Sequence, residues 1–406
     1  MHFYLKPIFN SKNGAKMKNC IITPTFKGHF EYISDYLKSF QLNAKPKDNF
    51  EICFTISKDE AKAFSKITQK FSDLNINTLF FEDILSHFNI TDTPSELLQK
   101  YGKYSFQTLK KFYTMLYLGK EYRFLVLDSE SILYRPYNIN QIFDDFFKNP
   151  FISGTNLKYR SCGYICKNVK KSTSFLLEKE TSIWFLENFV WFYDFKILSD
   201  LFEKYGTPFQ MVDRVYGAME KNSSNGIFEI DVYQTYIYHN LDKYSYRFID
   251  LDKEFKAFKN NKTYRKIHQA KFGGECGLFE HIMLFLNKEN VEWFSNLLKK
   301  LSFNIIRCDG TTAENYKLQK QFMETVQPVI LAASQDHYFG VKHNIQQLLI
   351  ICSNLRSIQK LQKHLKAFFS PLAKLIIWIL EPINILKYLV KTCSSLLLNI
   401  IKLKFK

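Results

Sequence analysis

Short apolar runs and helix-spaced apolar positions alternate along the first part of the chain. Residues 20–23, 50–56 and 76–81 are compact apolar runs that predict buried strands. Between the first two, apolar side chains recur at steps of three and four from 30 to 40, which predicts a helix with one buried face. This alternation over residues 18–150 is typical of βαβ units. We therefore expect an α/β fold built on a parallel sheet.

A strand that ends in two acids follows the longest predicted helix. Residues 105–118 have helical spacing, Gly119 ends them, and the apolar run 124–127 leads into Asp128 and Glu130. If the chain stays extended, side chains two residues apart point to the same side. Converging carboxylates disfavour each other's charge, and a hard divalent cation relieves that conflict. The plainer alternative is a polar turn that faces solvent.

The second part of the chain has a mixed pattern. The aromatic stretch 180–203 predicts a long helix, in which Trp184 and Trp191 lie seven residues apart on one face. That spacing favours a core position over a sugar-stacking platform. Residues 228–238 alternate in part and predict a strand, and 263–287 hold a compact polar cluster rich in Gly, His and Glu.

Charge is concentrated at the C-terminal end of the sequence. The net charge is +17, and residues 341–406 contain eleven Lys or Arg against one acid, Glu381. From Ile383 onward the polar residues form one helical stripe on an otherwise apolar helix, which predicts a helix lying on an anionic membrane surface. Packing against the body or in an oligomer is the alternative. The stripe interrupts every apolar run before it reaches the ~20 residues that span a bilayer.

Composition narrows the class of protein further. Aromatic residues make up 17% of the chain, which excludes a disordered protein. Residues 1–16 lack the apolar core of a signal peptide and form an N-terminal extension, and the scattered cysteines fit a reducing cytoplasm. The basic residues of the tail stand beside apolar ones and no recognised DNA or RNA module is present, so we expect no nucleic-acid partner.

The opening strand that ends in Thr23-Pro24-Thr25, the alternating elements and the acidic Asp128-Ser129-Glu130 resemble GT-A glycosyltransferases. The resemblance implies a Rossmann-like α/β/α sandwich over residues 17–330 with a mostly helical C-terminal extension. It also implies a nucleotide-sugar half, 17–150, and an acceptor half, 151–330. It is nearest to bacterial enzymes that build surface polysaccharide or lipo-oligosaccharide. The third motif position is Glu here, where Asp is more usual.

The same resemblance assigns roles to individual residues. It implies that Asp128 and Glu130 hold Mn²⁺ or Mg²⁺ against the donor diphosphate, and that Thr23 and Thr25 line the nucleotide end of the pocket. Cations near the leaving diphosphate assist by electrostatics. The candidates for that role, which also read as solvated helix or strand positions, are Lys110, Lys111 and Arg123.

The base and a further metal ligand come from later in the chain. The candidate bases are Glu275 in a Gly-Gly-Glu stretch, Asp213 and Asp231. Pairing with Arg214 is the simpler explanation for Asp213, and a structural role is the simpler explanation for each of the three acids. Glu275 is the first choice of base among them. A His often completes the metal site in this family. His268 is the first candidate and His281 the second.

Three hypotheses follow. The first is a cytoplasmic, membrane-peripheral, metal-dependent hexosyl- or N-acetylhexosaminyltransferase that moves a sugar from a nucleotide-sugar donor to a glycan or glycolipid acceptor. The second is a basic nucleic-acid-binding protein, which would bind DNA in a salt-sensitive way and ignore liposomes. The third is a non-catalytic membrane scaffold, which no divalent metal would make active.

Overall fold

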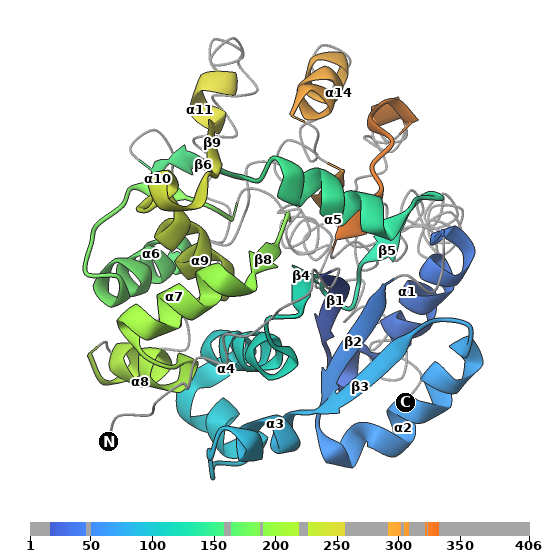
Figure 1. Ribbon diagram of the computed structural model, residues 1–406, viewed down its shortest axis with the longest axis vertical. Helices are drawn as coiled ribbons and strands as arrows, with labels where there is room; N and C mark the ends of the chain where they lie inside the picture. Colours follow the sequence, from blue (N-terminus) through green and yellow to red (C-terminus); the bar gives the residue numbers. More distant parts are fainter. Residues whose placement is uncertain are drawn as a thin grey trace, which may run out of the picture. The chain divides into compact units, whose positions relative to one another are not determined.

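A five-stranded sheet forms the centre of the part of the chain that the structure describes (Figure 1). Its four parallel strands and one antiparallel edge strand are, in spatial order, β3 (Ile76–Phe80), β2 (Glu51–Ile56), β1 (Lys18–Pro24), β4 (Tyr122–Val126) and β8 (Phe192–Asp194). The strands predicted at 20–23, 50–56, 76–81 and 124–127 are all present. The predicted α/β class is therefore confirmed.

The computed structural model describes residues 17–45, 50–157, 164–186, 190–218, 226–255, 291–301, 304–307, 321–322 and 324–332. All of these belong to one unit, Met1–Val341. The extension 1–16, the polar cluster 263–287 and the basic tail 341–406 lie outside the described residues. Among the helices of the described part, none is long and apolar enough to cross a bilayer.

Helices cover both faces of the sheet. On one face, Phe54 packs its ring 5.7 Å from that of Tyr36 and 5.0 Å from that of Phe64, which brings α1 (Phe30–Asn43) and α2 (Ala61–Thr68) against the strands. On the other face, the next residue, Thr55, hydrogen-bonds Thr114 of α4 (Pro94–Leu118) at 2.9 Å. The alternation of side chains along β2 thus gives the α/β/α sandwich, and Figure 1 shows α4 and α1 on opposite sides of the sheet.

Helix α4 carries Lys110 and Lys111 on its buried part. It begins at a capping box in which the Glu96 backbone N–H donates to Thr93 and the Glu96 carboxylate accepts from the Thr93 backbone. Gly119, with φ +86°, ends it as predicted. Gly102, with φ +77°, introduces a kink that separates its first two turns from the buried remainder.

Further helices surround this core. They are α3 (Phe81–His87), α5 (Ile139–Lys148), α6 (Tyr164–Leu176), α7 (Phe195–Tyr205), α8 (Pro208–Ala218), α9 (Glu229–Tyr238), α10 (Leu241–Tyr244), α11 (Leu251–Glu254) and α14 (Val291–Lys300). Single 3-10 turns occur at η1 (Lys27–His29), η2 (Lys58–Glu60) and η3 (Gln69–Phe71).

Two small sheets flank the central one in the described residues. The first has the order β7 (Ile183–Trp184), β6 (Phe151–Asn156) and β9 (Arg247–Asp250). The second has the order β10 (Ile305–Arg307), β11 (Ile330–Ala332) and β5 (Ile132–Leu133).

Two predictions of secondary structure were wrong. The stretch 180–203 is not one helix but β7, β8 and the start of α7, and both Trp184 and Trp191 are buried. The stretch 228–238 is helix α9 and not a strand. Residues 229–237 are all buried, so the sequence has no polar stripe that would show a helical period, and its β-branched and aromatic residues favour a strand locally.

Candidate functional site

The strand order reverses between β1 and β4. The chain moves from β1 outward to β2 and β3, then returns to place β4 on the other side of β1. Connections on either side of such a reversal diverge, which opens a crevice at the carboxyl ends of the two strands, and open α/β sheets bind ligands there. Thr25 follows β1 and Asp128 follows β4 at this edge.

The acidic motif forms a tight turn and not the extended segment that we expected. The Ser131 backbone N–H donates to the Asp128 carbonyl at 3.0 Å, which closes a turn over residues 128–131. Even so, both carboxylates act on the same cation: against the effect of burial, Glu229, Asp128 and Glu130 raise the pKa of Lys111. The two acids of the turn therefore share Lys111 as a neighbouring charge.

His29 is a component of the site that the sequence analysis missed. Its Nδ1 lies 2.9 Å from Ser129 Oγ and 3.3 Å from Glu130 Oε1, and the Ser129 hydroxyl donates to Glu130 Oε2 at 3.1 Å. His29 ends η1, directly after β1, so it reaches the acidic turn across the reversal point. The available signal was its position after a strand that neighbours the acid-bearing strand.

Lys111 and Glu229 form a buried ion pair on the α4 face of the sheet. Lys111 Nζ lies 2.5 Å from Glu229 Oε1, and the two side chains are 5% and 1% exposed. The ammonium also lies 5.0 Å from the centre of the Trp191 ring. Burial opposes its charge, but Glu229, Asp128 and Glu130 outweigh burial and raise the pKa of Lys111. Lys111 is therefore a permanently charged group beside the acidic turn, and not a solvated helix residue.

Tyr193 completes this buried group from strand β8. Burial, then the nearby charges of Glu229 and Asp128, raise the pKa of its phenol well above the ordinary value, so it stays protonated. Its hydroxyl is fully buried and finds no hydrogen-bond partner among the described residues. A protonated, unpartnered O–H beside two carboxylates is an unused donor in the site.

Lys110 and Thr25 meet on the first strand's side of the crevice. Lys110 Nζ donates to the Thr25 carbonyl at 2.8 Å, and burial lowers the pKa of Lys110 to about 8 despite the attraction of Glu60 and Glu82. The Thr25 hydroxyl is buried and has no partner within the described part of the chain. This orphaned hydroxyl fits the predicted nucleotide side of the pocket.

The structure places two other predicted donor residues away from the crevice. The Thr23 hydroxyl is fully buried and lies 2.9 Å from the Tyr36 hydroxyl under α1. Arg123 lies near the opposite end of β4, where its guanidinium donates to Asn19 at 2.9 Å and to Asp144 at 2.7 Å. Because three residues of strand separate Arg123 from the carboxyl end, it cannot share a ligand with Asp128.

Two predicted catalytic acids also have structural partners. Asp213, on α8, accepts from the Tyr101 hydroxyl at 2.8 Å and pairs with Lys100 at 3.2 Å, while its expected partner Arg214 pairs with Glu178. Its carboxylate is 53% exposed, and its contacts lie before the Gly102 kink of α4.

Asp231 is fully buried on α9 and faces α6. Its carboxylate accepts from Thr173 at 2.6 Å and pairs with Lys170 at 3.1 Å. Asp231 and Glu229 are two residues apart, which places them roughly 200° from each other around the helix axis. The two acids therefore point to different sides of α9. Glu275, His268 and His281 lie outside the described residues.

The donor set suits a hard cation that takes part of its coordination from a substrate. Asp128 and Glu130 supply carboxylate oxygens, and Mg²⁺ commonly uses one or two carboxylates together with substrate phosphates. Among the described residues, no group of three or more His, Cys, Asp or Glu side chains forms a complete metal site. Within the described part of the chain, the two carboxylates of the acidic turn are therefore the candidate ligands for such an ion.

Several solved structures are similar to this chain at low identity. Mouse xyloside xylosyltransferase 1, in its apo form, aligns with 64% of this chain and 96% of its own, at 10% identity and a TM-score of 0.34. Core-mannan synthase A from Aspergillus fumigatus, in a Mn/GDP form, aligns over 54% and 72%, at 12% identity and a TM-score of 0.31.

The glycosyltransferase GlyE of Streptococcus pneumoniae TIGR4 aligns over 60% of this chain and 50% of its own, at 12% identity and a TM-score of 0.28. No protein-family model matches the sequence, and no curated protein matches it either. With TM-scores this low, function is inferred from the residues of the site and not from these matches.

The burial of Asp231 predicts a structural and not a catalytic phenotype. Asp231→Asn leaves Lys170 buried without its counter-charge, so we expect about 3–5 kcal/mol lower free energy of unfolding. Denaturant unfolding measures this change. Asp213→Asn, at an exposed pair, is the matched control and should cost no more than about 1 kcal/mol. Equal losses in the two variants would contradict the assignment.

The lowered pKa of Lys110 predicts a pH dependence of stability. Between about 8 and its ordinary value of 10.5, the unfolded chain binds more protons at this residue than the folded chain does. Stability from this group therefore rises with pH in that window. The free energies of unfolding of the wild type and of Lys110→Met are measured at pH 7, 8, 9 and 10. Above pH 8, the free energy of unfolding of the wild type should rise relative to that of Lys110→Met. A constant difference across the series would rule this out.

Proposed function

We propose that this chain is a GT-A-type glycosyltransferase that uses a nucleotide-sugar donor and a divalent cation. The observation that carries the proposal is the acidic turn Asp128–Glu130 at the carboxyl end of β4, beside the end of β1 at the reversal of strand order. Ligands of open α/β sheets bind at that place, and two acids there suit a cation that bridges to phosphate.

Each residue of the site has a distinct task in this proposal. Thr25 offers its orphaned hydroxyl to the nucleotide, and Lys110 fixes the Thr25 loop through its carbonyl. Asp128 and Glu130 would hold the divalent cation, Mn²⁺ or Mg²⁺, with His29 and Ser129 orienting Glu130. A cation held there would supply Lewis-acid stabilisation to the leaving diphosphate.

Lys111 stabilises the acidic turn from below. Its ammonium is held by Glu229, and against the effect of burial the charges of Glu229, Asp128 and Glu130 raise its pKa, so it stays positively charged before the substrate arrives. The ion pair with Glu229 offsets the desolvation of Lys111, so the ammonium is already in place in the folded protein before a ligand binds. Preorganised charges need no rearrangement at the moment of reaction.

We propose further that the donor sugar is a hexose or N-acetylhexosamine and that the acceptor is a surface glycan or glycolipid precursor. Eleven basic residues against one acid in 341–406 support an association with an anionic membrane surface. An enzyme of this kind would work at the cytoplasmic face, with Glu275 as base and His268 as a further metal ligand.

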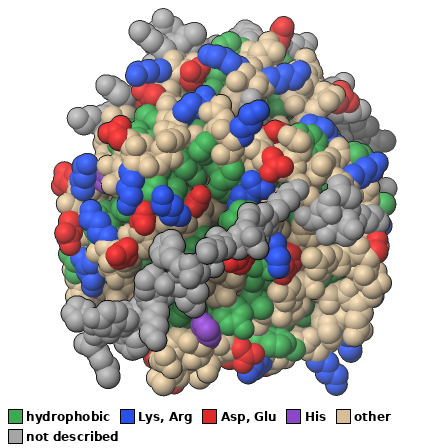
Figure 2. All heavy atoms as spheres, in the orientation of Figure 1, with side chains coloured by type: hydrophobic (Ala, Val, Ile, Leu, Met, Phe, Trp, Pro, Cys, Tyr) green, Lys and Arg blue, Asp and Glu red, His purple; other side chains and the backbone are tan. Residues whose placement is uncertain are grey.

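A nucleic-acid-binding role has less support. On the face that Figure 2 shows, the Lys and Arg side chains of the described residues are interspersed with acidic ones and do not form one continuous basic stripe. A continuous stripe is the usual electrostatic footprint of a nucleic-acid site. Donor hydrolysis distinguishes a transferase from a non-catalytic scaffold, since a scaffold would hydrolyse no donor with any divalent metal.

Donor hydrolysis tests the acidic turn. Wild type, Asp128→Ala and Glu130→Ala are assayed against a panel of UDP-, GDP- and CMP-sugars with Mn²⁺, Mg²⁺ or EDTA. We expect metal-dependent hydrolysis of one donor, reduced about 100-fold or more in each variant. Asp213→Ala, whose carboxylate lies before the α4 kink, is the matched control and should keep wild-type activity. Failure of every donor with well-folded protein would favour the scaffold.

A double replacement separates the structural role of Lys111 from its electrostatic one. Lys111→Met leaves Glu229 buried and unpaired, so its stability should fall by about 3–5 kcal/mol. Lys111→Met/Glu229→Leu removes both charges and should regain most of that stability. Hydrolysis by the double variant should still be about 100-fold below wild type, since the acidic turn has lost the positive charge of the Lys111 ammonium. Recovery of both stability and hydrolysis would show that the pair has only a structural role.

A further inference from the structure

A pocket lies on the other face of β8 from the acidic turn. It has a volume of about 560 Å³, which is within the range of small-molecule sites. Val190 and Phe192 line it, whereas Trp191 and Tyr193 point toward Lys111 and Glu229 on the opposite face. Because successive side chains of an extended segment alternate, a ligand in this pocket does not overlap the acidic turn.

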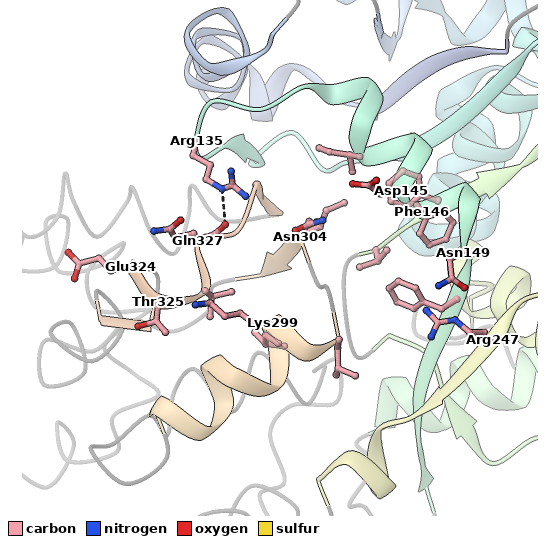
Figure 3. A pocket seen from close by; sticks show the side chains of 18 residues that line it. Arg135, Asp145, Phe146, Asn149, Arg247, Lys299, Asn304, Glu324, Thr325 and Gln327 are labelled. Carbon is pink, nitrogen blue, oxygen red and sulfur yellow. Dashed lines mark hydrogen bonds between the residues drawn. The ribbon is translucent and has the colours of Figure 1, made fainter.

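The pocket has an apolar floor and a polar rim. Phe146 of α5 and Phe192 stack with ring centres 4.2 Å apart, and with Phe151 they are 7%, 3% and 9% exposed. Since all three rings are nearly buried, none presents a face on which a nucleobase could stack. Figure 3 shows the polar side chains around this floor, with Asn149 and Arg247 on one side and Thr325 and Glu324 on the other.

One wall of the pocket is fixed by Arg135. Its Nε donates to the Gln327 carbonyl at 2.8 Å, as the dashed line in Figure 3 marks, and its guanidinium lies 4.9 Å from the centre of the Tyr137 ring. This contact joins the segment after β5 to the segment before β11. Arg135 is therefore committed to the wall and is not counted as a ligand group.

The lining carries more positive than negative charge, with three basic side chains against two acidic ones, Asp145 and Glu324. Asp145 accepts from Gln141 at 2.5 Å. The side chains of Arg247 and Lys299 are exposed and make no ion pair or hydrogen bond among the described residues. These two cations, from β9 and α14, are therefore the ones available to a ligand.

Two amides add a second type of recognition. Asn149 and Asn304 line the pocket, and their side chains make no hydrogen bond within the described part of the chain. A carboxamide both donates and accepts, as a hydroxyl group does, so neighbouring hydroxyls are its natural partners. An anion that also carries several hydroxyls satisfies the cations and the amides together.

We infer that this pocket binds an acidic saccharide unit, one that carries a carboxylate or a phosphate on a hydroxylated ring. The choice of a saccharide rests in part on the proposed function, in which the acceptor is a glycan. The pocket would hold a charged unit of that glycan at a distance from the acidic turn, so that one chain is bound at two places. Such tethering raises the effective concentration of the reacting end.

Calorimetric titration of the full chain at about 150 mM salt tests this inference. The probes are tetragalacturonic acid, neutral maltotetraose and inorganic phosphate. We expect the acidic tetrasaccharide to bind at least about tenfold more tightly than either other probe, since a hydrogen bond to a charged group contributes that much. Equal or tighter binding of phosphate or maltotetraose would overturn the inference, as would no binding of the acidic tetrasaccharide.

Variants locate the binding. Arg247→Gln and Lys299→Gln should each weaken tetragalacturonate binding about tenfold or more. The matched control is Lys300→Gln, one residue further along α14, which pairs with Glu254 at 2.8 Å and does not line the pocket. It should change affinity less than about twofold. A loss in Lys300→Gln equal to that in Lys299→Gln would mean that net charge alone attracts the ligand, and would overturn the inference.

The saccharide site and the proposed function can fail separately. Asp128→Ala should bind tetragalacturonate with the affinity of the wild type, because its acidic turn lies across β8 from the pocket. A wild type that binds the saccharide but hydrolyses no donor would retain this inference and reject the transferase. A wild type that hydrolyses a donor but binds no acidic saccharide would do the reverse.

Discussion

The site depends on the direction in which the chain winds its parallel sheet. Crossover connections between parallel strands are right-handed, so α1 and α2 cover one face while the chain moves outward from β1 to β3. To place β4 on the other side of β1, the connection must cross on the opposite face, and α4 occupies it. That reversal brings the ends of β1 and β4 together and puts Lys110 and Lys111 beneath them.

The first part of the fold could be predicted from the sequence because its signals are local. The strands at 20–23 and 50–56 are short apolar runs, and Gly119 marks a helix end, so each feature depends on neighbouring residues. The second part could not be predicted in the same way. Helix α9 is buried on every side and β8 has three residues, so neither pattern carries a period long enough to identify the element.

The candidate site was predictable at its centre and not at its periphery. Asp128 and Glu130 follow a buried strand, and this is visible without any tertiary information. His29 and Glu229 enter the site only through contacts between residues 100 and 118 positions apart, which no local pattern encodes. The same holds for Asp231, whose pairing with Lys170 can be recognised only when α6 and α9 are seen packed together. A carboxylate in a sequence does not reveal whether its partner is a substrate or a buried lysine.

The separation between Lys111 and Glu229 also has a consequence in time. The two residues are 118 positions apart, so at synthesis rates of about 5–20 residues per second Lys111 leaves the ribosome roughly 6–24 s before its partner. During that interval the nascent α4 contains a lysine that can be buried only at high cost. We therefore expect α4 to pack loosely against β1 and β2 until α9 has been synthesised. The segments that contain Lys111 and Glu229 are in this respect one folding unit, which a cut between them would leave incomplete.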